Sequence, residues 1–202
     1  MLLRPECKPL SEDARGLLAK LTPRGIVVHC SASRWGDAAE VRLWHLANGW
    51  SDIGYHGVIL NGHRDYNVAY VKTLDGKIEP GRAENVVGSH CKAGGMNNVS
   101  LGVCLIGNPG WQVDKADKAD PKLFSKPALA YATERQLDAL IHYLATQCKQ
   151  YGLNPKGKFK VGERSVYVLS QHSDHDPVNK PLCASLKMSE IRSLVAERLQ
   201  AV

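Results

Sequence analysis

The sequence predicts a single α/β domain in which a central mixed β-sheet is flanked by helices. Residues 24–31 and 100–107 are short, almost continuously apolar runs, which is typical of buried strands. Residues 133–151 instead repeat their apolar side chains at helical spacing. Because a helical segment stands between strand-like segments along the chain, we expect the helices to pack on the sheet.

Local signals predict the elements of the first part of the chain. Ser11 is a suitable cap for a short helix that reaches about Leu21, and the strand at 24–31 follows it. Asp37 is a suitable N-cap for a helix over 38–48, because an apolar face and a following glycine fit that pattern. The run "GYHGVILNG" then predicts a strand that ends in a turn.

A hairpin signal and a long polar stretch come next. Asp75-Gly76 lies between extended runs and predicts a β-hairpin. Residues 108–132 are polar, contain proline and include the repeat "DKADKAD", so we expect a surface insertion there. One domain is expected to span residues 1–202, with an N-terminal extension at 1–21 and a core of about 22–202.

The last part of the chain supplies two helices and a strand. Thr133 and Gln136 have the spacing of a capping box at the start of the helix that ends near residue 151. A loop rich in Lys and Gly follows, and "SVYVLSQHSDHD" predicts a strand that carries His172 at its end. The final helix has its apolar positions at Ile191, Leu194, Val195 and Leu199.

Composition limits the class of partner. The net charge of +6 favours anions such as nucleic acid, a membrane face or an anionic cell-wall polymer. The 26 basic and 20 acidic residues are interspersed, without a run of five like charges, so no nucleic-acid partner is expected. The start of the chain has no stretch apolar and long enough for a signal peptide or membrane span, so we expect synthesis as a soluble cytoplasmic chain. We also expect a monomer. The six cysteines lie far apart, and reduced thiols are expected.

Two histidines and one cysteine form a candidate metal site. His29 and His172 each fall at the polar end of an apolar strand, and Cys183 follows in a proline-containing loop. Such residues can converge at one edge of a sheet, and imidazole and thiolate are donors that Zn²⁺ prefers. From spacing alone, a core histidine bonded to a backbone carbonyl is the other interpretation of His29. Its neighbour Cys30 should point to the opposite face of the strand and belong to the core.

Several segments resemble one enzyme family and occur in the family's order. They are "VVHCSAS", "VRLWHLANGWSDIGYHGVILNG", "DGKIEPGRAENVVGSH", "NNVSLGVCLIG" and "SQHSDHDPVNKPLC". The chain thus resembles the zinc-dependent N-acetylmuramoyl-L-alanine amidases, which include bacteriophage lysozyme-type amidases and peptidoglycan recognition proteins. The resemblance covers about residues 25–107 and 134–200 and is greatest for the phage-type branch. It implies the fold of that family and hydrolysis of the amide between N-acetylmuramic acid and L-alanine.

The resemblance also implies roles for particular residues. It assigns His29, His172 and Cys183 as zinc ligands, Tyr55 as the catalytic tyrosine and Lys180 as the catalytic lysine. Zinc lowers the pKa of a bound water and polarises the scissile carbonyl. Tyr55 would orient or deprotonate that water, and Lys180 would stabilise the oxyanion or pass a proton to the leaving amine.

Four further residues are predicted to lie beside the cleft. Arg82, His90 and Asn98 match family positions there and are expected to contact substrate, although turn residues bonded to backbone would look the same. His175 is expected in the second layer around the metal or on the substrate, and it replaces His172 as ligand if the loop is threaded differently. The remaining histidines are interpreted as structural or exposed: His45, His56, His63 and His142.

The chain departs from the family pattern near its third ligand. Two residues, rather than one, separate Lys180 from Cys183, and Ala184 stands where the family has proline. Lys180 is therefore expected to approach from a shifted backbone.

The resemblance predicts a peptidoglycan hydrolase, either a phage-type lysin or an exported wall-degrading effector. A cytoplasmic amidase that recycles soluble muropeptides is the alternative within the enzyme class. A non-catalytic peptidoglycan-binding module is the alternative outside it, and loss of the cysteine ligand would indicate that state. Cys183 is present, which favours an enzyme.

Overall fold

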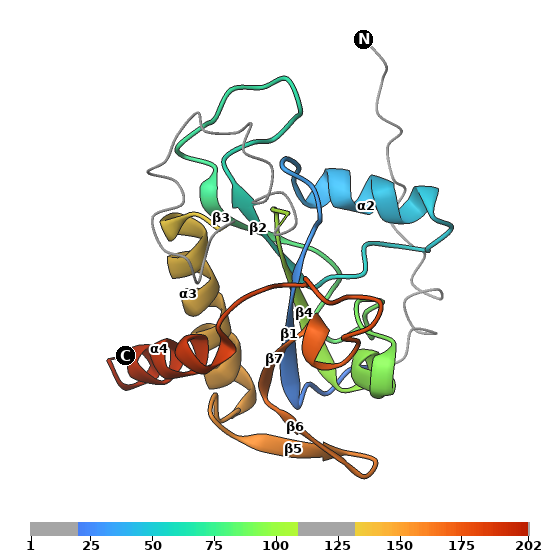
Figure 1. Cartoon of the computed structure of the whole chain (residues 1–202), viewed down its shortest axis with the longest axis vertical. Coiled ribbons are helices and arrows are strands. Elements are labelled where there is room, and N and C mark those ends of the chain that lie inside the picture. Colours follow the sequence, from blue (N-terminus) through green and yellow to red (C-terminus); the bar gives the residue numbers. More distant parts are fainter. Residues whose placement is uncertain (1–19, 109–131, 202) are drawn as a thin grey trace.

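The computed structural model describes residues 20–108 and 132–201 (Figure 1). Its main sheet has the strand order β3-β2-β4-β1-β7. The strands are β1 (Gly25–Cys30), β2 (Gly57–Asn61), β3 (Asp75–Pro80), β4 (Ser100–Leu105) and β7 (Leu169–Gln171). β4 pairs in parallel with β1 and β2, β7 pairs in parallel with β1, and β3 is antiparallel to β2. The predicted mixed sheet is confirmed.

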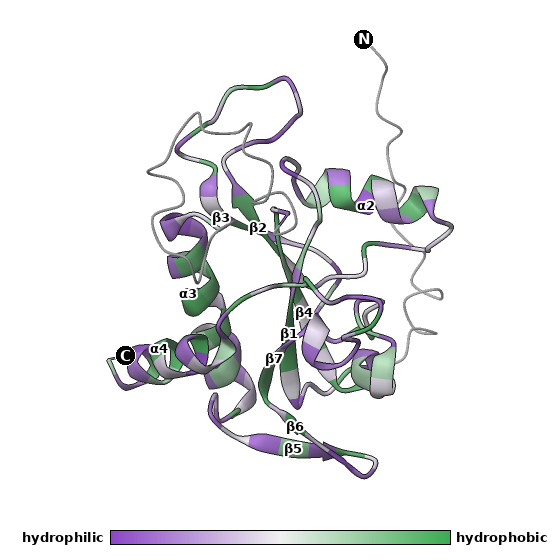
Figure 2. Ribbon diagram, in the orientation of Figure 1, coloured by the Kyte–Doolittle hydropathy of each residue, from purple (hydrophilic) through white to green (hydrophobic). Residues whose placement is uncertain are grey.

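Helices cover both faces of this sheet. They are α2 (Ala38–Ala47), α3 (Glu134–Tyr151) and α4 (Met188–Gln200), with 3₁₀ turns η1 (Ala93–Asn98) and η5 (His172–Asp174). The helices α3 and α4 pack together on one face, whereas α2 and the two 3₁₀ turns lie on the other (Figure 1). Figure 2 shows the central strands mostly in the hydrophobic colour and both colours on the helices, as expected for amphipathic helices on a buried sheet.

Side chains of β1 alternate between these two faces. Ile26 and Val28 belong to the core cluster formed with α3 and α4, and Val27 packs with Met96 of η1 on the opposite face. Because side chains alternate along a strand, His29 points to the same face as Val27. The β1 sequence therefore directs His29 away from the larger core.

The predicted helix caps at Asp37 and Thr133 are confirmed. Asp37 accepts a hydrogen bond from the backbone N–H of Glu40 at 2.8 Å at the start of α2. At the start of α3, Thr133 and Gln136 form both hydrogen bonds of a capping box. These local bonds satisfy backbone donors that a helix leaves free at its N-terminus.

The interpretation of Asp75-Gly76 as a tight hairpin turn is wrong. These residues begin β3, and residues 62–74 form the connection from β2. Gly76 has φ +78°, and a Cβ there would lie 2.7 Å from the backbone oxygen of Arg135 in α3. The glycine thus permits close approach of the helix, a tertiary requirement that gives the same sequence signal as a turn.

Replacing Gly76 by alanine is expected to lower the free energy of unfolding by about 1–3 kcal/mol, because the side chain meets both backbone strain and a clash. Gly49 is a matched control, since it has φ +81° but open space where its Cβ would lie. Chemical denaturation of both variants measures the difference. Equal losses for Gly76→Ala and Gly49→Ala would show that the close approach of α3 has no energetic effect.

The predicted strand at 165–176 is two strands in the structure. β6 (Arg164–Tyr167) pairs with β5 (Lys158–Val161) in a separate hairpin, and β7 then joins the main sheet. The segment expected to be a Lys- and Gly-rich loop therefore contains β5. A continuous extended pattern does not reveal where a chain changes its pairing partner, because that choice depends on distant strands.

Some expectations fall outside the described residues. They include nearly all of the Ser11-capped helix and the N-terminal extension, and most of the insertion at 108–132. Within residues 20–108 and 132–201, no helix has both the length and the apolar character needed to cross a membrane.

Candidate metal centre

Two histidines and a cysteine meet at the end of the central sheet. His29 lies near the C-terminal end of β1, His172 begins η5 directly after β7, and Cys183 lies in the loop before α4. Because β1 and β7 pair in parallel, both histidines emerge at the same level of the sheet. His29 Nδ1 lies 3.1 Å from His172 Nδ1 and 3.8 Å from Cys183 Sγ. The donor atoms of the three residues all lie within 4.8 Å of one another.

The donor set and its spacing fit a tetrahedral zinc ion. Zinc binds imidazole nitrogen at about 2.0–2.1 Å and thiolate sulfur at about 2.3 Å, so tetrahedral angles require about 3.3 Å between two nitrogens and about 3.6 Å between nitrogen and sulfur. The distances of 3.1 Å and 3.8 Å from His29 Nδ1 are close to these values. Three protein ligands leave a fourth position open, which is the arrangement of catalytic zinc sites.

The imidazole of His29 is neutral. Burial lowers its pKa well below the ordinary value, and His90, His172, His175 and Lys180 lower it further. His29 Nε2 lies 3.0 Å from Nδ1 of His90, and burial lowers the pKa of His90 to about 3. Both rings are therefore uncharged at neutral pH, and a neutral ring can offer a lone pair to a metal.

The thiol of Cys183 requires a nearby cation to ionise. The backbone N–H of Cys30 donates to Cys183 Sγ at 3.3 Å. A hydrogen bond with the Cys30 thiol, and then burial, raise the pKa of Cys183 above its ordinary value. A divalent cation among the three donors would supply the charge that a thiolate needs. Cys30 also packs partly against the core cluster of α3 and α4, as expected from its position in β1.

Tyr55 lies beside the three donors. It precedes β2, and its ring centroid is 5.1 Å from that of His29. Burial raises the pKa of Tyr55 well above its ordinary value, and the thiols of Cys104 and Cys183 raise it further. The phenol therefore keeps its proton well beyond neutral pH, and its hydroxyl is hydrogen-bonded with the Cys104 thiol.

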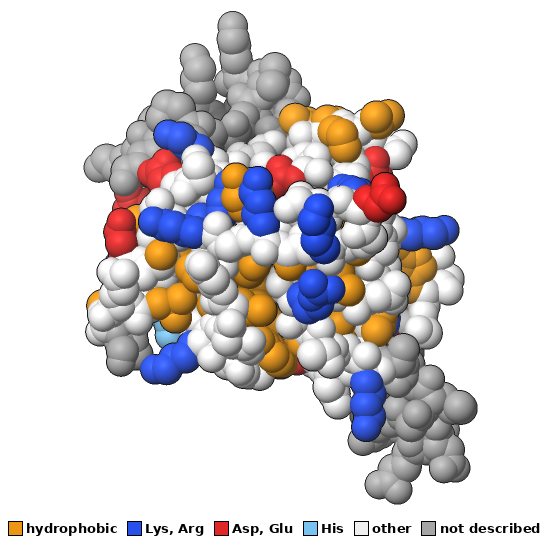
Figure 3. Space-filling model, turned by 90° about the horizontal axis from the view of Figure 1, so that it is seen from below, with side chains coloured by type: hydrophobic (Ala, Val, Ile, Leu, Met, Phe, Trp, Pro, Cys, Tyr) orange, Lys and Arg blue, Asp and Glu red, His pale blue; other side chains and the backbone are white. Residues whose placement is uncertain are grey.

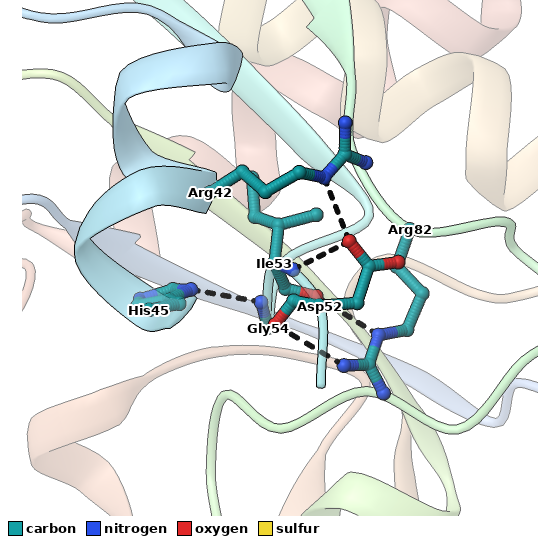
Figure 4. A network of polar contacts seen from close by, with 6 residues as sticks. All are labelled: Arg42, His45, Asp52, Ile53, Gly54 and Arg82. Atoms are coloured by element: carbon teal, nitrogen blue, oxygen red, sulfur yellow. Dashed lines mark hydrogen bonds and ion pairs between the residues drawn. The ribbon is translucent and has the colours of Figure 1, made fainter. Parts of the chain in front are cut away.

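A polar network fixes the segment that carries Tyr55 (Figure 4). Arg42 Nε donates to Asp52 Oδ1 at 2.7 Å, and the backbone N–H of Gly54 donates to His45 Nδ1 at 2.9 Å. Arg42 and His45 both lie on α2. The His45 ring also packs 5.3 Å from the Tyr55 ring, measured between centroids. The helix therefore holds both the backbone before Tyr55 and the ring itself.

Lys180 approaches the site from the loop between η5 and α4. Its side chain is exposed, and its positive charge is one of the influences on the pKa of His29. The backbone N–H of Cys183 donates to the Lys180 oxygen at 3.2 Å, which closes a turn over residues 180–183. The turn accommodates the extra residue that separates this lysine from the cysteine.

A protein-family model covers most of the chain, including His29 and His172. The model described as N-acetylmuramoyl-L-alanine amidase matches residues 19–182. The chain belongs to this amidase family. It is 35% identical over 135 residues to the endolysin of Enterobacteria phage T3, which is 65% of this chain and 71% of the relative. It is 36% identical over 129 residues to the endolysin of Escherichia phage T7, covering 62% and 67%.

Solved structures share the fold of this amidase. The amidase LysC from Clostridium intestinale superposes with a TM-score of 0.57 at 21% identity and covers 95% of this chain and 93% of its own. Drosophila peptidoglycan recognition protein PGRP-LB superposes with a TM-score of 0.53 at 21% identity, covering 87% and 83%. The fold class expected from the sequence is therefore confirmed.

The amidase holds Arg82 inside the fold. Arg82 Nε donates to the Ile53 oxygen at 2.8 Å, and Nη1 donates to the Val87 oxygen at 2.7 Å. Arg82 thereby ties the residues after β3 to the segment before Tyr55, opposite the contacts from α2 (Figure 4). Its predicted contact with substrate stays a prediction.

His175 lies outside the trio of donors in the amidase. Its Nε2 is 2.8 Å from the Ser170 hydroxyl, and its ring is buried. In the described part of the chain, the metal-compatible group contains His172 rather than His175. The geometry thus favours His172 over His175 as the candidate ligand. A substrate contact of His175 stays a prediction.

A neighbouring asparagine has a role that the sequence did not reveal. The predicted substrate contact Asn98 is exposed at the end of η1. The preceding residue, Asn97, accepts hydrogen bonds from the backbone N–H groups of His90 at 2.9 Å and Cys91 at 2.7 Å. Asparagine in a turn commonly binds nearby backbone, but its sequence position does not identify which backbone.

Proposed function

We propose that this amidase is a zinc-dependent peptidoglycan hydrolase of the phage-lysin type. It cleaves the amide between N-acetylmuramic acid and the L-alanine of the stem peptide. The observation that carries this proposal is the convergence of His29, His172 and Cys183 within 4.8 Å of one another, with Tyr55 beside them. This set combines a metal site that has an open position with a protonated donor.

His29, His172 and Cys183 would hold the zinc, which supplies an activated water and polarises the scissile carbonyl when it is bound. Tyr55 is protonated at neutral pH, and burial raises its pKa further, so its hydroxyl would donate a hydrogen bond that orients the nucleophile or the developing oxyanion. Lys180 brings a positive charge to the same end of the site from an exposed position. It would stabilise the oxyanion or pass a proton to the departing amine.

The relatives and the surface charge support a cell-wall substrate. The curated relatives from phages T3 and T7 are named endolysins. The chain carries a net charge of +6, and Figure 3 shows Lys and Arg side chains spread over the face seen from below. The β5–β6 hairpin contributes exposed basic side chains there, at Lys158, Lys160 and Arg164. Such a surface attracts the anionic polymers of a bacterial wall. Its site of action would be the periplasmic wall.

Removal of metal is expected to abolish hydrolysis of purified sacculi, and added zinc should restore it. Mass spectrometry of the digest should find stem peptides with a free L-alanine amino group and glycan strands that keep their lactyl groups. Soluble anhydro-muropeptides tested in parallel distinguish a lysin from a recycling amidase. Full activity in metal-free protein would contradict the zinc mechanism, and cleavage within the glycan strand would contradict the assigned bond.

A further inference from the structure

The hydrogen bonds behind His29 form a chain with a fixed direction. His90 Nε2 lies 3.1 Å from the backbone oxygen of Ser100, and a carbonyl oxygen only accepts, so His90 Nε2 carries a proton. In a neutral ring, Nδ1 is then an acceptor. His29 Nε2, which is 3.0 Å from that atom, must therefore donate. The result leaves His29 Nδ1 without a proton, and this is the atom that faces His172 and Cys183.

The fold provides a specific place for the His90 ring. Gly102 lies inside β4, and a Cβ there would be 2.4 Å from Cγ of His90. A Cβ at Gly88 would be 2.7 Å from Cδ2 of the same ring. Asn97 fixes the His90 backbone by accepting a hydrogen bond from its N–H at 2.9 Å. Glycine within a strand is unfavourable unless something approaches closely, and here the approaching group is the His90 ring.

The geometry points to His90 as a positioning residue that sets the tautomer of His29, with the Ser100 backbone oxygen as the fixed end of the chain. This inference rests on the proposed zinc site and deepens it. Before any metal binds, His90 keeps the proton of His29 on Nε2, so that the lone pair of His29 Nδ1 is available to the metal. The same hydrogen bond fixes the orientation of the His29 ring. Because metal-bound histidines depend on such outer partners, loss of the acceptor on His90 should weaken metal binding by about 10–100-fold.

The first test measures the tautomers in the metal-free wild-type protein. Long-range proton–nitrogen NMR on protein with ¹⁵N-labelled histidine distinguishes a proton on Nδ1 from one on Nε2. We expect His29 and His90 each to carry the proton on Nε2. A proton on Nδ1 of either ring would overturn the inference, and this result needs neither zinc nor a variant.

The second test measures zinc affinity by chelator competition in His90 variants. His90→Phe keeps a flat ring but has no acceptor, so its affinity should fall by about 10–100-fold. His90→Asn places a carbonyl oxygen near the position of Nδ1, so it should recover most of that loss and keep His29 protonated on Nε2.

His56 offers a matched control. It is also buried, its Nδ1 accepts from the Gly102 N–H at 2.9 Å, and its Nε2 lies 2.9 Å from the Val86 oxygen. His56→Phe should lower stability without changing the zinc affinity or the tautomer of His29. Equal losses of zinc affinity in His56→Phe and His90→Phe would overturn the inference, since they would reflect general loosening.

The outcomes separate this inference from the proposed function. If wild-type protein binds zinc and His90→Phe binds it equally well, the positioning role fails and the zinc site stands. If wild-type protein binds no zinc, the proposed function fails, and the tautomers of His29 and His90 still decide the inference. If His90→Phe does not fold, the wild-type NMR measurement alone gives the decision.

Discussion

The His172→Ala variant is expected to contain little or no zinc, whereas the wild-type protein is expected to contain about one zinc per chain. His172 supplies one of three donors, and its Nδ1 lies 3.1 Å from that of His29. Two remaining ligands hold zinc poorly, so turnover should fall below about one thousandth of the wild-type value. His29→Ala and Cys183→Ala should behave in the same way. Elemental analysis beside a sacculus-hydrolysis assay measures both effects.

Two variants control for general damage to the fold. His175→Ala removes a buried histidine that is hydrogen-bonded with the Ser170 hydroxyl. This variant should retain zinc. Cys148→Ala removes a buried cysteine of α3 that packs in the core, and it should also retain zinc. A site that is emptied by His175→Ala but filled in His172→Ala would show that the loop is threaded the other way.

Tyr55→Phe and Lys180→Ala are expected to bind zinc and wall normally but to lose about 10²–10³-fold in turnover. In the proposed mechanism, both groups would act on charge that develops in the transition state. Tyr55 lies against His29, with ring centroids 5.1 Å apart, and burial raises its pKa above an ordinary value that already lies well above neutral pH. Loss of kcat without loss of binding identifies interactions made in the transition state.

Steady-state kinetics, with zinc content measured in parallel, tests both residues. Tyr143→Phe is a control for Tyr55, because Tyr143 is a buried tyrosine of α3 whose hydroxyl has no hydrogen-bond partner in the described structure. Lys187→Ala is a control for Lys180, because it removes an exposed lysine at the end of the same loop. A Lys180→Ala enzyme within about threefold of wild type would exclude Lys180 from the mechanism.

Elements whose signals are local could be predicted before the structure was known. Strand β1 follows from a short apolar run, and the caps at Asp37 and Thr133 follow from hydrogen bonds between residues three positions apart. The resemblance to the amidase family selected His29, His172 and Cys183, which the fold then brings together. The strand and the caps are predictable because periodicity and capping depend on neighbouring residues. The three donors could be selected because histidine and cysteine are distinctive residue types, and their role as zinc ligands stays a prediction.

Packing and hydrogen bonds between residues far apart in the sequence became visible only in the folded structure. It assigned Gly76 to close packing against α3 rather than to a turn, and it divided one extended run between two sheets. It also placed His90 behind His29, across a separation of 61 positions, in space that Gly102 provides. The sequence signal for this close approach was a glycine, Gly102, in the apolar run of β4. A glycine shows that some group can approach closely, but it does not show which group. The parallel pairing of β1 with β4 places His29 near Gly102, and His90 reaches the same place from the segment between β3 and η1. Both are long-range choices that no local pattern contains.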